Sequence, residues 1–307
     1  MMTDVRKRRP GFTLIEMLVV ITIIILLASL TVAFLPSIND HKKASDGASI
    51  VQNTLLLAKQ RALRDQAPRG VRLIPDPSNK NYASSLQYIE QPDDFTGGTV
   101  TGPVGAAPVE TFTFSGVDLW GGFGPSDPTV WPVQPGDYLV MQQTNLYLII
   151  GVSASTMVQA MGPSSASGTT SDYRIVRAPR PLLAEAPVEL PQDVAIDLTG
   201  VGQSNPPPPV TRSIIVPDFH APPSLAKPGV SHLDILFSPS GAVVRQGSKA
   251  GKFILWVRDI TKPDLDGDQV LVTVYTRTGM VVPHPADPTN NYANPYTFTE
   301  DGRDSGD

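Results

Sequence analysis

The chain has 307 residues, enough for one or two domains with a hydrophobic core, and its 31 prolines and 25 glycines favour a loop-rich, mostly β body over a helical bundle. It contains no cysteine, which excludes disulfides, thiolate metal sites and cysteine nucleophiles. The net charge is −5, and because the first eleven residues carry +3, the remaining −8 argues against nonspecific binding to nucleic acid.

The first predicted element is a long apolar helix behind a basic segment at Arg6–Arg9. The 24 residues from Phe12 to Leu35 are nearly all apolar, whereas a helix needs roughly 20 to span a bilayer. The basic flank should remain cytoplasmic, so the chain after residue 36 should lie across the membrane. A cleaved signal peptide would have a shorter apolar core, and a plain membrane anchor would leave the carboxylate of Glu16, inside the apolar run, without a role.

A known signal contains both the basic segment and this carboxylate. The stretch GFTLIEMLVVITII resembles the prepilin signal of type IV pilins and type II secretion pseudopilins, and the matching residues are Gly11, Phe12, Thr13, Leu14, Ile15 and Glu16. The resemblance implies that prepilin peptidase cuts between Gly11 and Phe12 on the cytoplasmic side, and that the new amino group of Phe12 is N-methylated. A glycine, a hydrophobe and a glutamate at fixed spacing make the signal specific.

After such a cut, Phe12 would carry a positive amine one helical turn before Glu16. When helices of this kind stack with an axial offset, the carboxylate of one subunit can meet the amine of its neighbour. Each charge is then paired within lipid, where an isolated charge is costly. We therefore interpret Glu16 as an assembly residue that fixes the register between subunits, much as one buried polar residue fixes the register of a coiled coil.

The helix is expected to continue after the apolar run, with a kink at Pro36 because proline removes a backbone hydrogen bond. Apolar residues then recur at spacings of three and four, which predicts an amphipathic helix over 37–66 that packs on a globular domain. These residues are Ala44, Ala48, Val51, Leu55, Ala58 and Ala62. Pro68 and Gly70 should end the helix.

The rest of the chain is predicted to be antiparallel β-sheet, which makes the fold class α+β. Strands are expected at 69–74, 85–91, three within 135–161, 171–179, 194–198, 212–216, 233–237, 253–258 and 270–277. The intervening stretch 92–135 is rich in glycine, proline and threonine, and no strand is predicted there. The prolines at 204–210 predict a polyproline II linker, and the polar end of the chain predicts a flexible tail.

Three later motifs are similar to those of the H-type minor pseudopilins of type II secretion and the related T-type minor pilins. They are a helix end at Ala58–Leu63 with Lys59 where arginine is usual, a strand–turn–strand at Ile235–Val244, and a closing strand with a Thr-Gly end at Val272–Val281. Because that group is usually shorter, residues 92–178 are interpreted as a β-rich insertion. The expected organisation is a leader at 1–11, a transmembrane helix at 12–36, the helix and first strands of a pilin-like domain at 37–91, the insertion at 92–178, the remaining sheet at 179–282 and the tail at 283–307.

The sequence contains no motif with the spacing of a catalytic, metal or cofactor site. Asp264, Asp266 and Asp268 are weak candidates for calcium, but an EF-hand loop starting at Asp264 would need glycine and glutamate where Gln269 and Tyr275 stand. A solvated turn is therefore favoured. The four histidines lack the spacing of a zinc protease, and no nucleophile elbow or phosphate-binding loop is present. We expect a protein that is not an enzyme and that needs no cofactor.

The sequence thus predicts a minor pseudopilin, a structural subunit of the type II secretion pseudopilus that promotes protein export. It should be a single-pass inner-membrane protein with its N-terminus in the cytoplasm and its globular domain in the periplasm. The expected partners are other pseudopilins or pilins through the N-terminal helix, prepilin peptidase, the inner-membrane assembly platform and membrane lipid.

Two alternatives remain open at the level of the sequence. One is a minor pilin of a type IV pilus, for DNA uptake or adhesion, and the other is a monomeric membrane-anchored β domain that binds a ligand or another protein. Nucleic acid is not an expected partner, because the tail has Arg303 alone among acidic residues where DNA-binding T-type pilins carry a basic tail.

Overall fold

The computed structural model describes residues 13–106, 108–142, 145–163, 167–182, 184–199, 233–244, 251–262, 267–287 and 295–301. The chain divides into two compact units, residues 1–43 and residues 44–307. An N-terminal helix is followed by antiparallel sheets, which confirms the predicted α+β class. The strand expected at 212–216 and the proline linker at 204–210 lie outside the described residues.

Helix α1 (Leu14–Asp65) is a single element of 52 residues. The helical backbone continues through Pro36, although proline has no N–H to donate there, so the helix does not end at this residue. It ends at Asp65 because Gln66 adopts a left-handed backbone conformation, with φ of 52°, which turns the chain out of the helix. The end of the predicted amphipathic segment, at residue 66, therefore lies one residue from the end in the structure.

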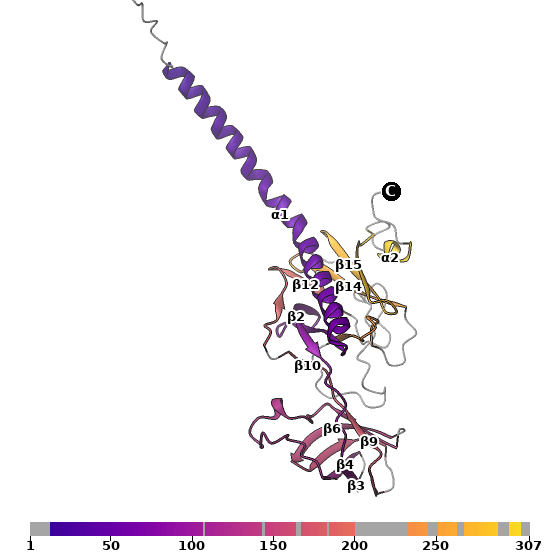
Figure 1. Ribbon diagram of the computed structural model, residues 1–307. Coiled ribbons are helices and arrows are strands. Elements are labelled where there is room, and N and C mark those ends of the chain that lie inside the picture. Colours follow the sequence, from indigo (N-terminus) through magenta and orange to yellow (C-terminus); the bar gives the residue numbers. More distant parts are fainter. Residues whose placement is uncertain are drawn as a thin grey trace, which may run out of the picture. The chain divides into compact units, whose positions relative to one another are not determined.

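The second half of α1 lies over a β-sheet that contains β2, β12, β14 and β15 (Figure 1). All six residues of the predicted apolar stripe are buried, from Ala44 to Ala62. They join one hydrophobic core with sheet residues such as Leu73 and Val257. Gly47 lets the helix approach closely, since a Cβ there would stand only 2.6 Å from Cγ1 of Val194.

This first sheet has the strand order β13-β1-β2-β12-β14-β15-β16, and β10 and β11 also pair with β2. Every pairing in it is antiparallel. Its strands are β1 (Arg69–Pro75), β2 (Tyr82–Glu90), β10 (Arg180–Pro181), β11 (Val188–Glu189), β12 (Val194–Asp197), β13 (Leu233–Phe237), β14 (Lys252–Asp259), β15 (Gln269–Tyr275) and β16 (Met280–Pro285).

Strand β16 was not predicted, and it crosses the boundary at 282 where the sequence predicts the flexible tail to begin. The reason is that Pro283 and Pro285 obscure the strand signal, although proline is tolerated on the edge of a sheet. Further along, helix α2 (Thr297–Asp301) follows Tyr296, whose ring packs edge-on against Trp256 with ring centres 5.8 Å apart. Part of the predicted tail therefore packs on the first sheet.

The second sheet is built entirely from residues between 99 and 176, in the order β8-β3-β4-β7-β6-β5-β9. Figure 1 shows β3, β4, β6 and β9 grouped together. Its elements are β3 (Thr99–Ala106), β4 (Val109–Ser115), a short 3₁₀ helix η1 (Pro128–Val130), β5 (Tyr138–Met141), β6 (Asn145–Ala154), β7 (Met157–Met161), β8 (Gly168–Thr170) and β9 (Tyr173–Val176). The three strands predicted within 135–161 are β5, β6 and β7.

The second sheet closes on itself into a small barrel. Strands β8 and β9 stand at opposite ends of the strand order, yet only Ser171 and Asp172 separate them in the sequence. One bent segment therefore pairs with β3 on one side and with β5 on the other. The enclosed side chains form a second hydrophobic core, distinct from the one under α1, which includes Phe112, Tyr147 and Ile175.

Candidate assembly site and barrel junction

Helix α1 begins with a reciprocal capping arrangement between Thr13 and Glu16. The backbone N–H of Thr13 donates to Oε2 of Glu16 at 3.0 Å, and the backbone N–H of Glu16 donates to Oγ1 of Thr13 at 3.3 Å. The Thr13 hydroxyl also donates to Oε2, at 3.1 Å. This capping box satisfies donors that the first turn of a helix leaves unpaired. The Thr-x-x-Glu spacing is the signal of this box in the sequence, and it was not among the predicted features.

The predicted cleavage residues, Gly11 and Phe12, lie outside the described residues, so the structure places only Glu16 of that group. Within the described part of the chain, Oε1 of Glu16 accepts no hydrogen bond, because both donors from Thr13 point at Oε2. One carboxylate oxygen is therefore used for the cap and the other remains open as an acceptor.

The large apolar side chains of the first turns of α1 are exposed on every side of the helix rather than along one stripe. Their exposed fractions run from 47% for Val20 to 84% for Leu14. The hydroxyls in this stretch bond to the helix itself: Thr22 donates to the carbonyl of Leu18, and Ser29 to that of Leu26, each at 2.8 Å. Such a surface needs an apolar surrounding. Within the part of the chain that the structure describes, no helix has the length and apolarity that a membrane span requires.

The three later motifs of the family resemblance meet in the structure. Nζ of Lys59, on α1, donates to the carbonyl of Thr278 at 2.8 Å. Gly241, in the turn after β13, packs against Lys59 and Leu63, and a Cβ at Gly279 would overlap the carbonyl oxygen of Gly241. The end of the helix and the two turns thus form one contact cluster, which explains why the turns have glycine at these positions.

This tight contact predicts that Gly279→Ala destabilises the fold more than backbone strain alone can. Gly279 has φ of 59° and Gly122, in the barrel, has φ of 81°, but no atom lies within 4 Å of a Cβ at Gly122. Gly122→Ala should therefore cost about 1–2 kcal/mol of unfolding free energy, and Gly279→Ala about 1–3 kcal/mol more. Urea denaturation of both variants measures the difference. Equal losses of unfolding free energy in the two variants would show that the turn at Gly241 can move away from the new Cβ without cost.

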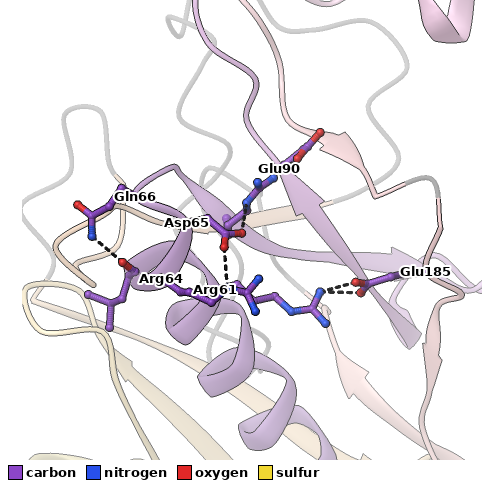
Figure 2. Close-up of polar contacts among 8 residues, drawn as sticks. Arg61, Arg64, Asp65, Gln66, Glu90 and Glu185 are labelled. Atoms are coloured by element: carbon purple, nitrogen blue, oxygen red, sulfur yellow. Dashed lines mark hydrogen bonds and ion pairs between the residues drawn. The ribbon is translucent and has the colours of Figure 1, made fainter.

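Ion pairs fasten the C-terminal end of α1 to the first sheet, as Figure 2 shows. Arg61 donates to both carboxylate oxygens of Glu185, at 2.7 and 2.6 Å, and its guanidinium lies 4.2 Å from the centre of the Tyr88 ring. Arg69, on β1, donates to Asp65 at 3.2 Å and also pairs with Glu90 on β2. These contacts hold the helix against β1 and β2.

A buried carboxylate, Asp137, lies where the barrel meets the first sheet and is only 1% exposed. Its Oδ1 accepts the backbone N–H of Ala178 at 2.8 Å, and its Oδ2 accepts that of Gln134 at 2.8 Å and Nη2 of Arg180 at 3.1 Å. Burial raises the pKa of the Asp137 carboxyl above its ordinary value, and the positive charge of Arg180 partly offsets this effect.

Arg180 connects the two sheets. It lies on β10, where it pairs with Glu90 of β2, so its backbone belongs to the first sheet. Its guanidinium reaches the barrel, where Nη1 donates to the carbonyl of Trp131 at 2.9 Å and Nη2 to that of Pro132 at 2.8 Å. The sequence does not indicate this pair, because Asp137 and Arg180 are 43 residues apart.

Of the three weak calcium candidates, the structure places only Asp268. Asp264 and Asp266 lie outside the described residues, and among the described residues no three His, Asp or Glu side chains are grouped to hold a metal. A cavity of about 580 Å³ opens on the barrel and is lined by Thr96, Val140, Asp172, Tyr173 and Arg174. In it, Arg174 pairs with Asp94 at 3.1 Å and the Tyr173 hydroxyl donates to the carbonyl of Gly97. This lining contains no nucleophile paired with a base.

Comparison with known families identifies the N-terminal segment. Residues 6–32 match the family model of the prokaryotic N-terminal methylation motif. No curated protein sequence matches the chain. The motif is the prepilin-type signal of pilins and pseudopilins, which confirms the predicted signal. It implies membrane anchoring by the N-terminal helix, processing by prepilin peptidase and assembly with other pilins, and it favours a structural protein over an enzyme.

Proposed function

We propose that this chain is a minor pseudopilin, a structural subunit of a type II secretion pseudopilus that assembles in the inner membrane and periplasm to promote protein export. The observation that carries the proposal is the methylation motif at residues 6–32, which leads into a helix that continues to Asp65 and packs on an antiparallel sheet. In this arrangement the N-terminus is cytoplasmic and the two sheets are periplasmic.

In this proposal prepilin peptidase cuts between Gly11 and Phe12, and the amino group of Phe12 is methylated. Glu16 then pairs with the amine of a neighbouring subunit. The capping box supports this assignment, because it occupies Oε2 of Glu16 and leaves Oε1 as an acceptor. The carboxylate can therefore keep its own helix capped while it pairs with a neighbour.

The cluster around Lys59, Gly241 and Gly279 supports the assignment to the H-type minor pseudopilins. Those three motifs come from distant parts of the sequence and are in direct contact in the fold. A role in DNA uptake is disfavoured by charge: residues 81–226 contain no lysine, and the insertion at 92–178 has a net charge of −5. A surface of that sign repels the phosphates of nucleic acid.

A strain that lacks the gene tests the proposal. We expect its type II substrates to accumulate in the periplasm, its pilus-dependent motility and DNA uptake to be unchanged, and a plasmid copy to restore secretion. Mass spectrometry of the purified complementing protein should give a methylated N-terminus at Phe12. Normal secretion with loss of a pilus function would contradict the proposed role, and recovery of the intact Met1 chain from the membrane would contradict the processing.

A further inference from the structure

We propose that the barrel carries a docking site for a protein partner, built around Phe123 at the tip of the loop that joins β4 to β5. This loop comprises residues 116–137 and is called the Phe123 loop below. The partner that fits it is a protein with an apolar pocket and a basic rim. This inference goes beyond the proposed function, which assigns no role to the barrel.

Phe123 is not covered by any part of the chain that the structure describes. Its side chain is 61% exposed, and among the described residues it is the only phenylalanine, tyrosine or tryptophan in the exposed class. Other aromatic residues of the same loop are covered: Trp131 is 5% exposed, and Trp120 is partly buried. Large aromatic side chains in the centre of an interface are common anchors for a partner protein.

The base of the Phe123 loop is fixed in the core of the barrel. Leu119 and Val133, on its two arms, are fully buried there. Next to them the rings of Trp120 and Trp131 stack with centres 5.5 Å apart. The guanidinium of Arg180 holds the second arm from the first sheet through the carbonyls of Trp131 and Pro132, as described above.

The backbone is also held on both sides of Phe123. The N–H of Gly122 donates to Oδ2 of Asp118 at 2.8 Å, and the carbonyl of Gly124 accepts Nε1 of Trp131 at 2.7 Å. The exposed ring thus stands between two fixed residues. A partner that binds it loses little conformational entropy in ordering the loop, and such preorganisation favours binding.

Charge selects the class of partner. The insertion at 92–178 contains seven acidic residues, two arginines and no lysine. Glu110 and Asp137 are buried, but the other five acids are exposed. Two of these exposed acids, Asp118 and Asp127, are in the Phe123 loop itself. An acidic surface repels nucleic acid and anionic lipid, whereas it attracts a basic protein surface. The phenylalanine ring carries no polar group, so the pocket that receives it should be apolar.

Site-specific photocrosslinking in the native cells tests this inference. A benzoylphenylalanine is placed at position 123 or, as a matched control, at position 104 of the full-length chain. Val104 is also 61% exposed and lies on β3 of the same barrel. We expect one protein to be crosslinked from position 123 and not from position 104. That protein is then purified for binding measurements with the full-length parent, Phe123→Ala and Val104→Ala.

We expect Phe123→Ala to weaken binding by at least about tenfold, as for an anchor residue, and Val104→Ala to leave it within about twofold. Raised salt should weaken binding to the parent, because the charges of the two surfaces are opposite. Near-UV circular dichroism should be the same for all three proteins. Processing at Phe12 and secretion are separate readouts, so failure of this inference leaves the proposed function intact.

Four results would overturn the inference. They are equal crosslinking from positions 123 and 104, equal affinity of the purified partner for the two alanine variants, Phe123-dependent self-association of the chain, and Phe123-dependent binding to vesicles of 3:1 phosphatidylcholine and phosphatidylglycerol. The last two would assign the loop to a second copy of the chain or to a membrane surface instead.

Discussion

Glu16→Ala should reduce crosslinking of the chain to neighbouring pseudopilin subunits by at least about tenfold, because the amine of a subunit then loses its counter-charge in lipid. Insertion into the membrane should be unchanged or favoured, since a carboxylate leaves the apolar run. Cleavage after Gly11 should also persist, because the scissile bond lies one helical turn away. Crosslinking in the membrane, together with a secretion assay, measures the effect.

Two further variants separate the charge of Glu16 from its capping role. Glu16→Gln keeps the capping box, in which glutamine is also favourable, but removes the charge, so its assembly should be intermediate. Thr13→Ala removes the hydroxyl that takes part in the cap but keeps the carboxylate, so it should assemble almost like the parent. A processed Glu16→Ala protein that crosslinks and functions like the parent would show that Glu16 does not fix register, and would favour a membrane-anchored monomer.

Arg180→Ala should lower the unfolding free energy of the barrel by about 3–5 kcal/mol, because it removes the main counter-charge of the buried carboxylate of Asp137. The variant also loses the hydrogen bonds to Trp131 and Pro132. Urea denaturation followed by tryptophan fluorescence measures the loss. Arg64→Ala is a suitable control, because Arg64 pairs with its neighbour Asp65 and its side chain is 74% exposed, so stability should change little.

The loss of unfolding free energy in Arg180→Ala should also depend on pH. Burial already raises the pKa of Asp137 in the folded protein, and removal of the positive charge of Arg180 raises it further. The folded variant therefore holds a proton on Asp137 in a pH range where the unfolded chain, whose carboxyl titrates near pH 4, has released it. The loss of unfolding free energy relative to the parent should be largest at neutral pH and should shrink as the pH falls towards about 4. If the difference in unfolding free energy between the parent and Arg180→Ala stays constant with pH, the loss comes from the hydrogen bonds alone.

Local signals made part of this fold readable from the sequence. The spacing of Gly11, Phe12 and Glu16 identified the N-terminal signal, and the recurrence of apolar residues from Ala44 to Ala62 predicted the buried face of α1. Both patterns lie on one helix, where residues three and four apart share a face. The capping box of Thr13 and Glu16 is equally local, since it joins residues three apart.

The features that the sequence did not predict are strands rich in glycine and proline, and contacts between residues far apart in the sequence. Strands β3 and β4 lie in a stretch rich in glycine, proline and threonine, and Pro103 stands where the register of β3 shifts. Such residues usually indicate loops, and only the neighbouring strands of the barrel make them strands. Asp137 and Arg180 come together only when the two sheets have formed, so no spacing in the sequence predicts their contact.

Closure of the barrel has a consequence for copies of the chain held close together. An open sheet presents unpaired N–H and C=O groups along its outer strands, and such edges tend to add strands from neighbouring molecules. The bent segment of β8 and β9 pairs with β3 at Val100–Gly102 and with all four residues of β5, so among the described residues the barrel leaves less free strand edge than an open sheet would. Copies held side by side therefore have less strand edge through which to join their barrels, and recognition of the barrel depends mainly on side chains on its surface.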